Sequence, residues 1–289
     1  MNRLLVAICS TALLLGLVAC SQSGTESPDA SVSTATESGT AVSTPSAEPT
    51  PSPSSSPVEA EPTPSPEPAE VTKTYRMNKN YFIVPIDKER TESKVVLLTF
   101  DDGPKDAKTL DPILDTLDKH HAKAIFFVNG YRVKANPDLL KTIDDRKQVI
   151  GNHSWDHIEL KKEQAPKIKE QIESVQEIVK EVTGKTPVFF RPPFASANDA
   201  VHQVAKDNGL LFMTWSNGSL DWDMNKIDED KRPQAIIDNV MEQLHSGSNI
   251  LMHELAWTAK GLDALLSQLE AKGYTFVDPN AIDIQSSGK

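Results

Sequence analysis

From residue 93 onward, segments with a strand-like pattern alternate with segments that have a helical pattern. Short continuous apolar runs predict buried strands, whereas apolar residues that recur every three or four positions predict amphipathic helices. The predicted strands cover 95–100, 124–128, 148–151, 188–190, 211–215, 249–253 and 274–277. The predicted helices cover 107–120, a segment that begins at Asn136, 165–182, 198–207, 233–244 and 258–272.

This alternation predicts an α/β fold with a parallel sheet and helices outside it. A folded region of about 190 residues is small for a complete eight-stranded barrel. We therefore expect a distorted, incomplete (β/α) barrel, formed by a single domain over 93–280. The alternative is an open doubly wound sheet. That alternative predicts no ring of ligands, whereas here polar motifs follow several different strands.

The N-terminal segment has a different pattern, with one positive charge at Arg3 followed by an apolar run. This layout predicts a secretory signal peptide over 1–20. Ala19-Cys20 resembles the end of a bacterial lipobox, which implies cleavage before Cys20 and lipidation of its thiol. The alternative is an ordinary signal peptide with an incidental cysteine. The remaining cysteine, Cys9, lies within the segment to be removed, so we expect no disulfide.

Residues 21–72 are rich in Ser, Thr, Pro, Ala and Glu and contain few large apolar residues. Such a segment cannot bury enough surface to offset its ordering entropy, so we expect a disordered linker. We expect an adapter over 73–92 and a short tail over 281–289. The chain has a formal net charge of −11 and no basic stripe, which argues against a nucleic-acid partner. The leader and linker predict an extracytoplasmic protein, lipid-anchored to the outer face of the bacterial membrane through Cys20.

Two adjacent carboxylates, Asp101 and Asp102, end the first predicted strand and precede a Gly-Pro turn. The C-terminal ends of parallel strands are where α/β folds carry their chemistry. One of these carboxylates can therefore bind a metal ion while its neighbour remains free as a base.

His153 and His157 are four residues apart, a spacing that on a helical turn would direct both imidazoles to one metal ion. Asp102 would supply a third, anionic ligand. Three protein ligands with open positions are typical of a catalytic rather than a structural site.

Further polar residues follow other predicted strands: Arg191 follows 188–190, Asp221 lies shortly after 211–215, and His253 ends 249–253. A cationic arginine can hold a free carboxylate ionised, and an aspartate beside a histidine raises the pKa of the imidazole. Each residue alone has an ordinary structural explanation. Their joint position at strand ends favours a catalytic site.

Together these motifs resemble those of the polysaccharide deacetylases of the NodB-homology type, carbohydrate esterase family 4. The resemblance covers about 94–279, nearly the whole predicted folded part. Its motifs occur in order at 99–104, 153–157, 191–195, 219–222 and 250–253.

The resemblance implies that Asp102, His153 and His157 hold one divalent metal ion. Zinc is the favoured ion and cobalt the alternative, because both accept two imidazoles and a carboxylate.

The resemblance also assigns catalytic roles. Asp101, steadied by Arg191, is implied as the general base. His253, tuned by Asp221, is implied as the acid that protonates the departing amine. The backbone N–H of Phe194 is implied as a donor to the developing oxyanion.

Trp222 and Leu251 are implied as walls of the acetyl pocket. Phe194 and Ala195 depart from the Tyr-Gly that is usual in the third motif. If position 195 needs a positive φ, alanine would strain the loop.

The function expected from this resemblance is metal-dependent removal of N-acetyl groups from amino sugars of a cell-wall polysaccharide. Peptidoglycan is the favoured substrate, because an enzyme tethered at the cell surface would face the wall, and we expect a monomer. The alternatives are a chitin-oligosaccharide deacetylase, an O-acetyl esterase of the xylan type, and a non-catalytic wall-binding lipoprotein.

Overall fold

The structure, a computed structural model, describes residues 71–287. The predicted signal peptide over 1–20, Cys20 and almost all of the predicted linker lie outside the described residues. Within 71–287, no helix has the length and apolar character needed to cross a lipid bilayer.

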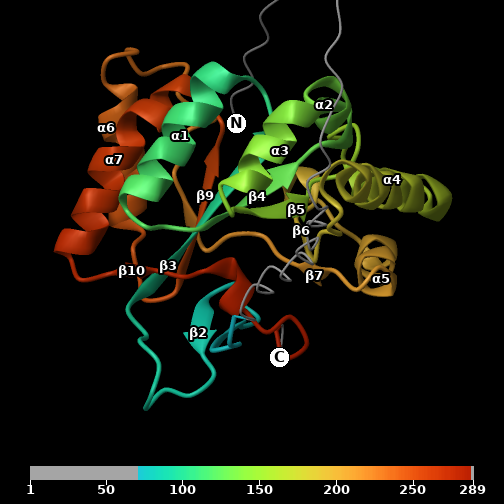
Figure 1. Ribbon diagram of the computed structural model, residues 1–289, viewed down its shortest axis with the longest axis horizontal. Coiled ribbons are helices and arrows are strands. Elements are labelled where there is room, and N and C mark those ends of the chain that lie inside the picture. The colour runs from blue at the N-terminus through green and yellow to red at the C-terminus, as the bar shows by residue number, and fades with distance from the viewer. Residues whose placement is uncertain (1–70, 288–289) are drawn as a thin grey trace, which may run out of the picture. The chain divides into compact units, whose positions relative to one another are not determined.

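Strands and helices alternate along the described chain (Figure 1). The strands are β1 (Tyr75–Met77), β2 (Ile83–Pro85), β3 (Val95–Gly103), β4 (Ala124–Val128), β5 (Val149–Asn152), β6 (Phe189–Phe190), β7 (Leu211–Phe212), β8 (Asn217–Gly218), β9 (Ser248–His253) and β10 (Thr275–Phe276). The helices are α1 (Ala107–Lys119), α2 (Gly130–Ala135), α3 (Pro137–Asp145), α4 (Ala165–Thr183), α5 (Asp199–Asp207), α6 (Arg232–Glu242) and α7 (Ala256–Ala271).

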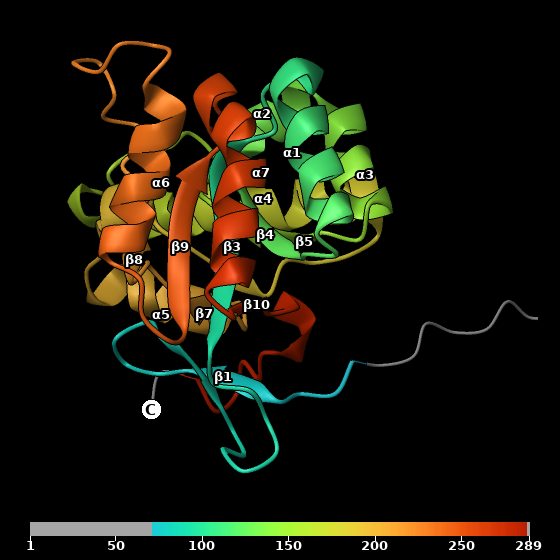
Figure 2. The ribbon, with the colours of Figure 1, turned by 90° about the vertical axis from the view of Figure 1, so that its left-hand side faces the viewer.

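The main sheet is parallel and has the strand order β7-β6-β5-β4-β3-β9-β8, with β10 paired to the start of β3. Its two end strands, β7 and β8, are not paired with each other, so the curled sheet forms part of a barrel. Figure 1 shows α1 and α3 over the sheet, and Figure 2 shows α6 and α7 packed side by side next to β9. The predicted incomplete barrel is therefore confirmed.

The central strand β3 contributes to both faces of the sheet because successive side chains point in opposite directions. Val96, Leu98 and Phe100 pack in the larger core cluster with the helices. Val95 and Leu97 pack in a second cluster on the inner face. A strand covered on both faces is apolar throughout, which explains its continuous hydrophobic run.

The inner cluster is covered by the adapter and by the C-terminal segment. Met77 and Ile83 of the β1–β2 hairpin are buried in it, and so is Ile282. The Ile83 N–H donates to the Gly247 carbonyl at 2.9 Å, next to the start of β9. Figure 2 shows β1 at the end of the sheet opposite to α2. The adapter and residues 281–282 thus pack as part of the folded unit.

The predicted elements agree with the structure except at a few ends. β3 continues to Gly103, three residues beyond the predicted 95–100. The helix α2 was not predicted, because its six residues are too few to show a helical pattern. Gly184 ends α4 in the left-handed conformation, at a φ of 73°, as expected for a helix stop.

Candidate active site

The predicted site residues surround a cavity of about 350 Å³ at the C-terminal end of the sheet. Each wall comes from the end of a different strand or from the loop that follows it. The parallel sheet therefore brings together residues that lie far apart in the sequence. The lining consists of Asp101, Asp102, His153, His157, Pro192, Phe194, Trp215, Trp222, Leu251 and His253. Arg191 and Asp221 are fully buried behind the residues that they contact.

Asp102, His153 and His157 form a cluster that can hold a metal ion. One ligand atom from each lies within 4.8 Å of the others. Asp102 Oδ1 is 3.1 Å from His157 Nε2 and 3.5 Å from His153 Nε2. His153 Nδ1 contacts the Arg191 carbonyl at 2.6 Å, which leaves its Nε2 directed at the cluster. A backbone partner of this kind orients metal-binding imidazoles in proteins, so these residues fit a divalent ion.

The charge states of this cluster also suit a metal ion. Burial alone would raise the pKa of Asp102, but contact with His157 and the positive charges of His153, His157 and His253 lower it below its ordinary value. Burial lowers the pKa of His153, which favours the neutral imidazole. An ionised carboxylate and a neutral imidazole are the forms that bind metals.

The two histidines reach the cluster from a loop, so the predicted helical turn is wrong. Residues 153–157 follow β5 without helical structure, and His157 has a φ of 55°. Two asparagines that the sequence analysis did not identify hold this loop. Asn129 Nδ2 donates to the His153 carbonyl at 2.8 Å, and the Ser154 N–H donates to Asn152 Oδ1 at 3.0 Å. The sequence offers one indication of this role: Asn129 directly follows the apolar strand β4, and Asn152 is the last residue of β5.

Asp101 lies beside the cluster, yet it has a different partner. Arg191 Nη1 donates to Asp101 Oδ1 at 2.7 Å and to Thr99 Oγ1 at 2.8 Å. The second terminal nitrogen of Arg191, Nη2, donates to the Thr214 carbonyl at 2.8 Å. Asp101 Oδ2 remains 3.7 Å from His153 Nε2 and borders the cavity. One oxygen is thus fixed by the arginine while the other faces the reaction space.

His253 borders the same cavity from the end of β9 and is paired with Asp221. Its Nδ1 is 2.7 Å from Asp221 Oδ1, while Thr258 Oγ1 donates to Oδ2 at 2.7 Å. Burial lowers the pKa of His253, but contact with Asp221 and the charges of Asp221, Asp101 and Asp102 outweigh it and raise the pKa above its ordinary value. The imidazolium form is therefore favoured.

Aromatic and aliphatic side chains complete the cavity wall. The Trp222 ring lies 5.3 Å from the ring of His253 and 6.3 Å from that of Trp215, measured between centroids. Trp215 was not assigned to the site from the sequence, although it is the last residue of the predicted strand 211–215. Leu251 is buried and lines the cavity.

Ala195 of the third motif adopts the positive φ at which an alanine is expected to strain the loop. Phe194 has a φ of 59° and Ala195 a φ of 52°. Both values lie in the region where a Cβ atom is disfavoured. Phe194 is 66% exposed, and its ring packs edge-on against that of His157 at 4.7 Å.

Glu254 is a further buried group that the sequence analysis did not place in the site. Its Oε1 accepts from the Lys105 N–H at 2.8 Å and from the Asp106 N–H at 3.2 Å. Its Oε2 lies so close to Gly103 that a Cβ there would come within 2.7 Å. Glu254, the residue after His253, thus fixes the backbone of Lys105 and Asp106 in the turn that follows Asp102.

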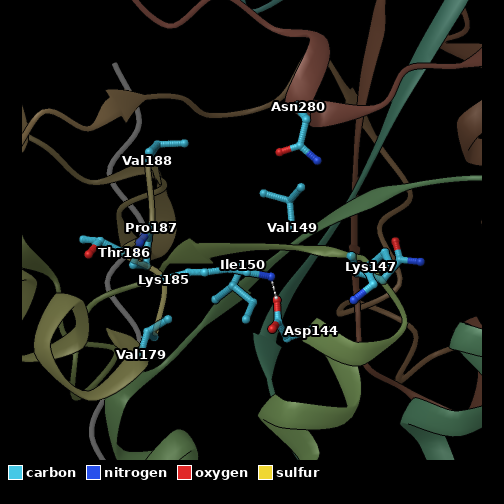
Figure 3. Close-up of a pocket in the computed structure, with 11 residues that line it drawn as sticks. Asp144, Lys147, Val149, Ile150, Val179, Lys185, Thr186, Pro187, Val188 and Asn280 are labelled. Atoms are coloured by element: carbon cyan, nitrogen blue, oxygen red, sulfur yellow. Dashed lines mark hydrogen bonds and ion pairs between the residues drawn. The ribbon is translucent and has the colours of Figure 1, made fainter. Parts of the chain in front are cut away.

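A second hollow, of about 290 Å³, lies at the opposite end of β5 and β6 (Figure 3). Its wall includes Val149, Ile150 and Val188, together with Lys185, which pairs with Asp144 at 2.5 Å. It contains none of the residues predicted to be functional.

Comparison with known proteins identifies the family of this chain. The polysaccharide deacetylase profile matches residues 88–213. The peptidoglycan-N-acetylmuramic acid deacetylase PdaA of Bacillus subtilis is 35% identical over 188 residues, which are 64% of this chain and 70% of that protein. The peptidoglycan-N-acetylglucosamine deacetylase PgdA of Listeria monocytogenes is 35% identical over 207 residues, which are 70% of this chain. This chain spans 42% of the length of PgdA.

A solved structure is similar in fold. It is a mutant, with restored enzymatic activity, of a CE4 family pseudoenzyme from Bacillus anthracis. The TM-score is 0.62 at 31% identity, over 68% of this chain and 70% of that chain. The motifs, the half-barrel and these similarities agree, and this chain belongs to the polysaccharide deacetylase family, carbohydrate esterase family 4.

Proposed function

We propose that this protein removes N-acetyl groups from amino sugars of peptidoglycan and releases acetate. The observation that carries the proposal is the placement of three functional units around one cavity. These are the Asp102-His153-His157 cluster, the Arg191-bound Asp101 and the Asp221-bound His253. The deacetylases PdaA and PgdA, which are similar over most of the folded part, support peptidoglycan as the substrate.

The side chains suggest how the amide bond is hydrolysed. Asp101, held by Arg191, accepts a proton from water at its free oxygen as the water attacks the acetyl carbon. The Phe194 N–H is the proposed donor to the oxyanion. His253 then donates its proton to the amine nitrogen as the C–N bond breaks.

A divalent ion at Asp102, His153 and His157 would supply Lewis acidity toward the carbonyl and toward water. Zinc is the proposed ion, because two imidazole nitrogens and one carboxylate oxygen are typical of its catalytic sites. Cobalt remains the alternative.

Membership of the family does not by itself establish catalysis, since the similar Bacillus anthracis protein is described as a pseudoenzyme. In this chain, however, the proposed base, acid and metal ligands are all present and border one cavity. This supports an active enzyme over a non-catalytic wall-binding protein.

The test is mass spectrometry of peptidoglycan fragments after incubation with the purified protein. We expect the loss of acetyl from the fragments and the release of acetate. Asp101→Asn should abolish both while still binding one metal ion, because it removes the base and keeps the ligands. Chitin oligosaccharides and acetylated xylan, tested in parallel, separate the two alternative activities. An unchanged peptidoglycan after treatment with metal-loaded wild-type protein would contradict the proposal.

We also propose lipidation at Cys20 and attachment to the outer face of the membrane. The apolar leader and Ala19-Cys20 support this location. Cell fractionation of the wild type and of Cys20→Ala tests it. We expect the wild type in the membrane fraction and the variant in the soluble exported fraction.

A further inference from the structure

The two histidines of the metal cluster differ in how the protein orients them. His153 Nδ1 contacts the Arg191 carbonyl at 2.6 Å, which fixes its ring. Among residues 71–287, no atom forms a hydrogen bond with Nδ1 of His157, whose ring packs edge-on against Phe194. The backbone of His157 has a φ of 55°, a conformation that a residue with a Cβ atom keeps only where its surroundings enforce it. The position of His157 therefore depends on what fixes the main chain of its loop.

The residue directly before His157, Asp156, is held by α4. The Asp156 N–H donates to Gln171 Oε1 at 2.8 Å, and Gln171 Nε2 donates to Asp156 Oδ2 at 2.7 Å. These two contacts determine which end of the amide is which, because a backbone N–H needs an acceptor and a carboxylate needs a donor. Gln171 is fully buried, whereas Asp156 is exposed. One buried amide thus binds both the backbone and the side chain of Asp156.

The same helix also holds the strand end from which the loop starts. Asn152, the last residue of β5, donates from Nδ2 to the Ile172 carbonyl at 2.8 Å and to Gln176 Oε1 at 2.9 Å. The apolar face of α4 is itself buried in two core clusters. The loop therefore contacts α4 twice, just before His153 and just before His157.

We propose that Gln171 is a positioning residue for the metal ligand His157 and acts through Asp156. This inference rests on the proposed function, in which His157 binds the ion, and extends it to a residue outside the cavity lining and outside the five motifs. Two hydrogen bonds to Asp156 keep the adjacent main chain where His157 Nε2 lies 3.1 Å from Asp102 Oδ1. Loss of such an outer partner typically weakens metal binding about 10- to 100-fold.

The experiment measures the zinc affinity of metal-free protein by competition with a chelator, together with urea unfolding of the same protein. Gln171→Met nearly keeps the volume of the side chain and removes both hydrogen bonds, so it should weaken zinc binding at least about tenfold. Gln234→Met is the matched control and should keep the wild-type affinity. It removes a similar contact, 2.8 Å from Gln234 Nε2 to Asp238 Oδ1, on the exposed surface of α6.

An exchange of donor and acceptor separates positioning from a general loss of stability. Gln171→Glu still accepts from the Asp156 N–H but places a second carboxylate against that of Asp156, so zinc affinity should fall. Combining Gln171→Glu with Asp156→Asn restores a donor opposite the new carboxylate oxygen and should recover most of the lost affinity. Asp156→Asn alone should stay near the wild type, because its amide oxygen still accepts from Gln171 Nε2.

Unchanged zinc affinity in a Gln171→Met protein that still unfolds cooperatively would overturn the positioning role. A double variant that binds zinc no better than Gln171→Glu alone would overturn it as well. Both results concern the ion and not the substrate. A zinc-loaded wild type that releases no acetate would instead contradict the proposed function, so the two failures are distinguishable.

Discussion

Asp101 and Asp102 are neighbours in the sequence, but their surroundings give them different chemistry. Arg191 holds one oxygen of Asp101 at 2.7 Å, whereas Asp102 faces His153 and His157. The adjacent carboxylates predicted that one would bind a metal and one would remain free. The buried partners that enforce this division, such as Thr99 and Asn129, could not be predicted, because an ordinary strand residue and a positioning residue look alike in one sequence.

The pair His253–Asp221 makes a prediction about pH. His253 must carry a proton to donate it, and its raised pKa keeps that proton to higher pH than an ordinary imidazole would. Activity should therefore persist at neutral pH and fall as the pH rises through the raised pKa. Asp221→Asn removes the carboxylate that raises the pKa, so the alkaline limb of kcat/KM should move to lower pH. At neutral pH, kcat should fall about 100-fold.

The measurement is a pH profile of kcat/KM for the wild type and the variant. Asp223→Asn, at an exposed position two residues away, is the control and should keep the wild-type profile. An unshifted alkaline limb in Asp221→Asn would show that His253 is not the acid.

At the scale of elements, the site depends on loops that begin where apolar strands end. The sequence predicted these strands well, since a buried parallel strand is apolar along its length. The shape of the loops could not be predicted, because it depends on contacts between distant segments. The histidine loop is the example: the His153–His157 spacing suggested a helical turn, whereas Asn129 and Asn152 hold a loop without helical structure.

Glu254 connects two elements, the end of β9 and the turn before α1. Glu254→Ala should leave the amides of Lys105 and Asp106 without their acceptor and lower the free energy of unfolding by about 2 kcal/mol. The loosened turn should also weaken metal binding at Asp102. Denaturant unfolding and metal titration measure these effects. Glu254→Gln keeps an acceptor oxygen and should recover most of both. Wild-type values for Glu254→Ala in both measurements would contradict this role.

In the folded unit as a whole, one end of the sheet carries the candidate active site and the opposite end is closed by packing. The cavity lies at the C-terminal ends of the strands, while the β1–β2 hairpin and Ile282 close the inner core at the other end. The sequence indicated the incomplete barrel from its length and strand count. It did not show that the adapter packs on the barrel core, because three-residue strands leave almost no pattern.

This packing predicts a contrast between two isoleucines of the adapter. Ile83 is 1% exposed and Ile86 is 48% exposed. Ile83→Ala should lower the free energy of unfolding by about 2 to 5 kcal/mol, because it leaves a cavity in the core. Ile86→Ala should change it by less than about 0.5 kcal/mol. Urea denaturation compares the two, and equal losses would contradict the packing of β2 on the barrel.

The central claim is that Asp102, His153 and His157 hold one ion on which deacetylation depends. The most direct measurement is a titration of metal-free protein with zinc, in which bound metal and acetate release are followed together. For the wild type, both should rise in parallel and level off at about one equivalent. His157→Ala should bind at least about 100-fold more weakly, while His202→Ala should match the wild type. Full acetate release by the metal-free protein, or by His157→Ala without bound metal, would contradict the account.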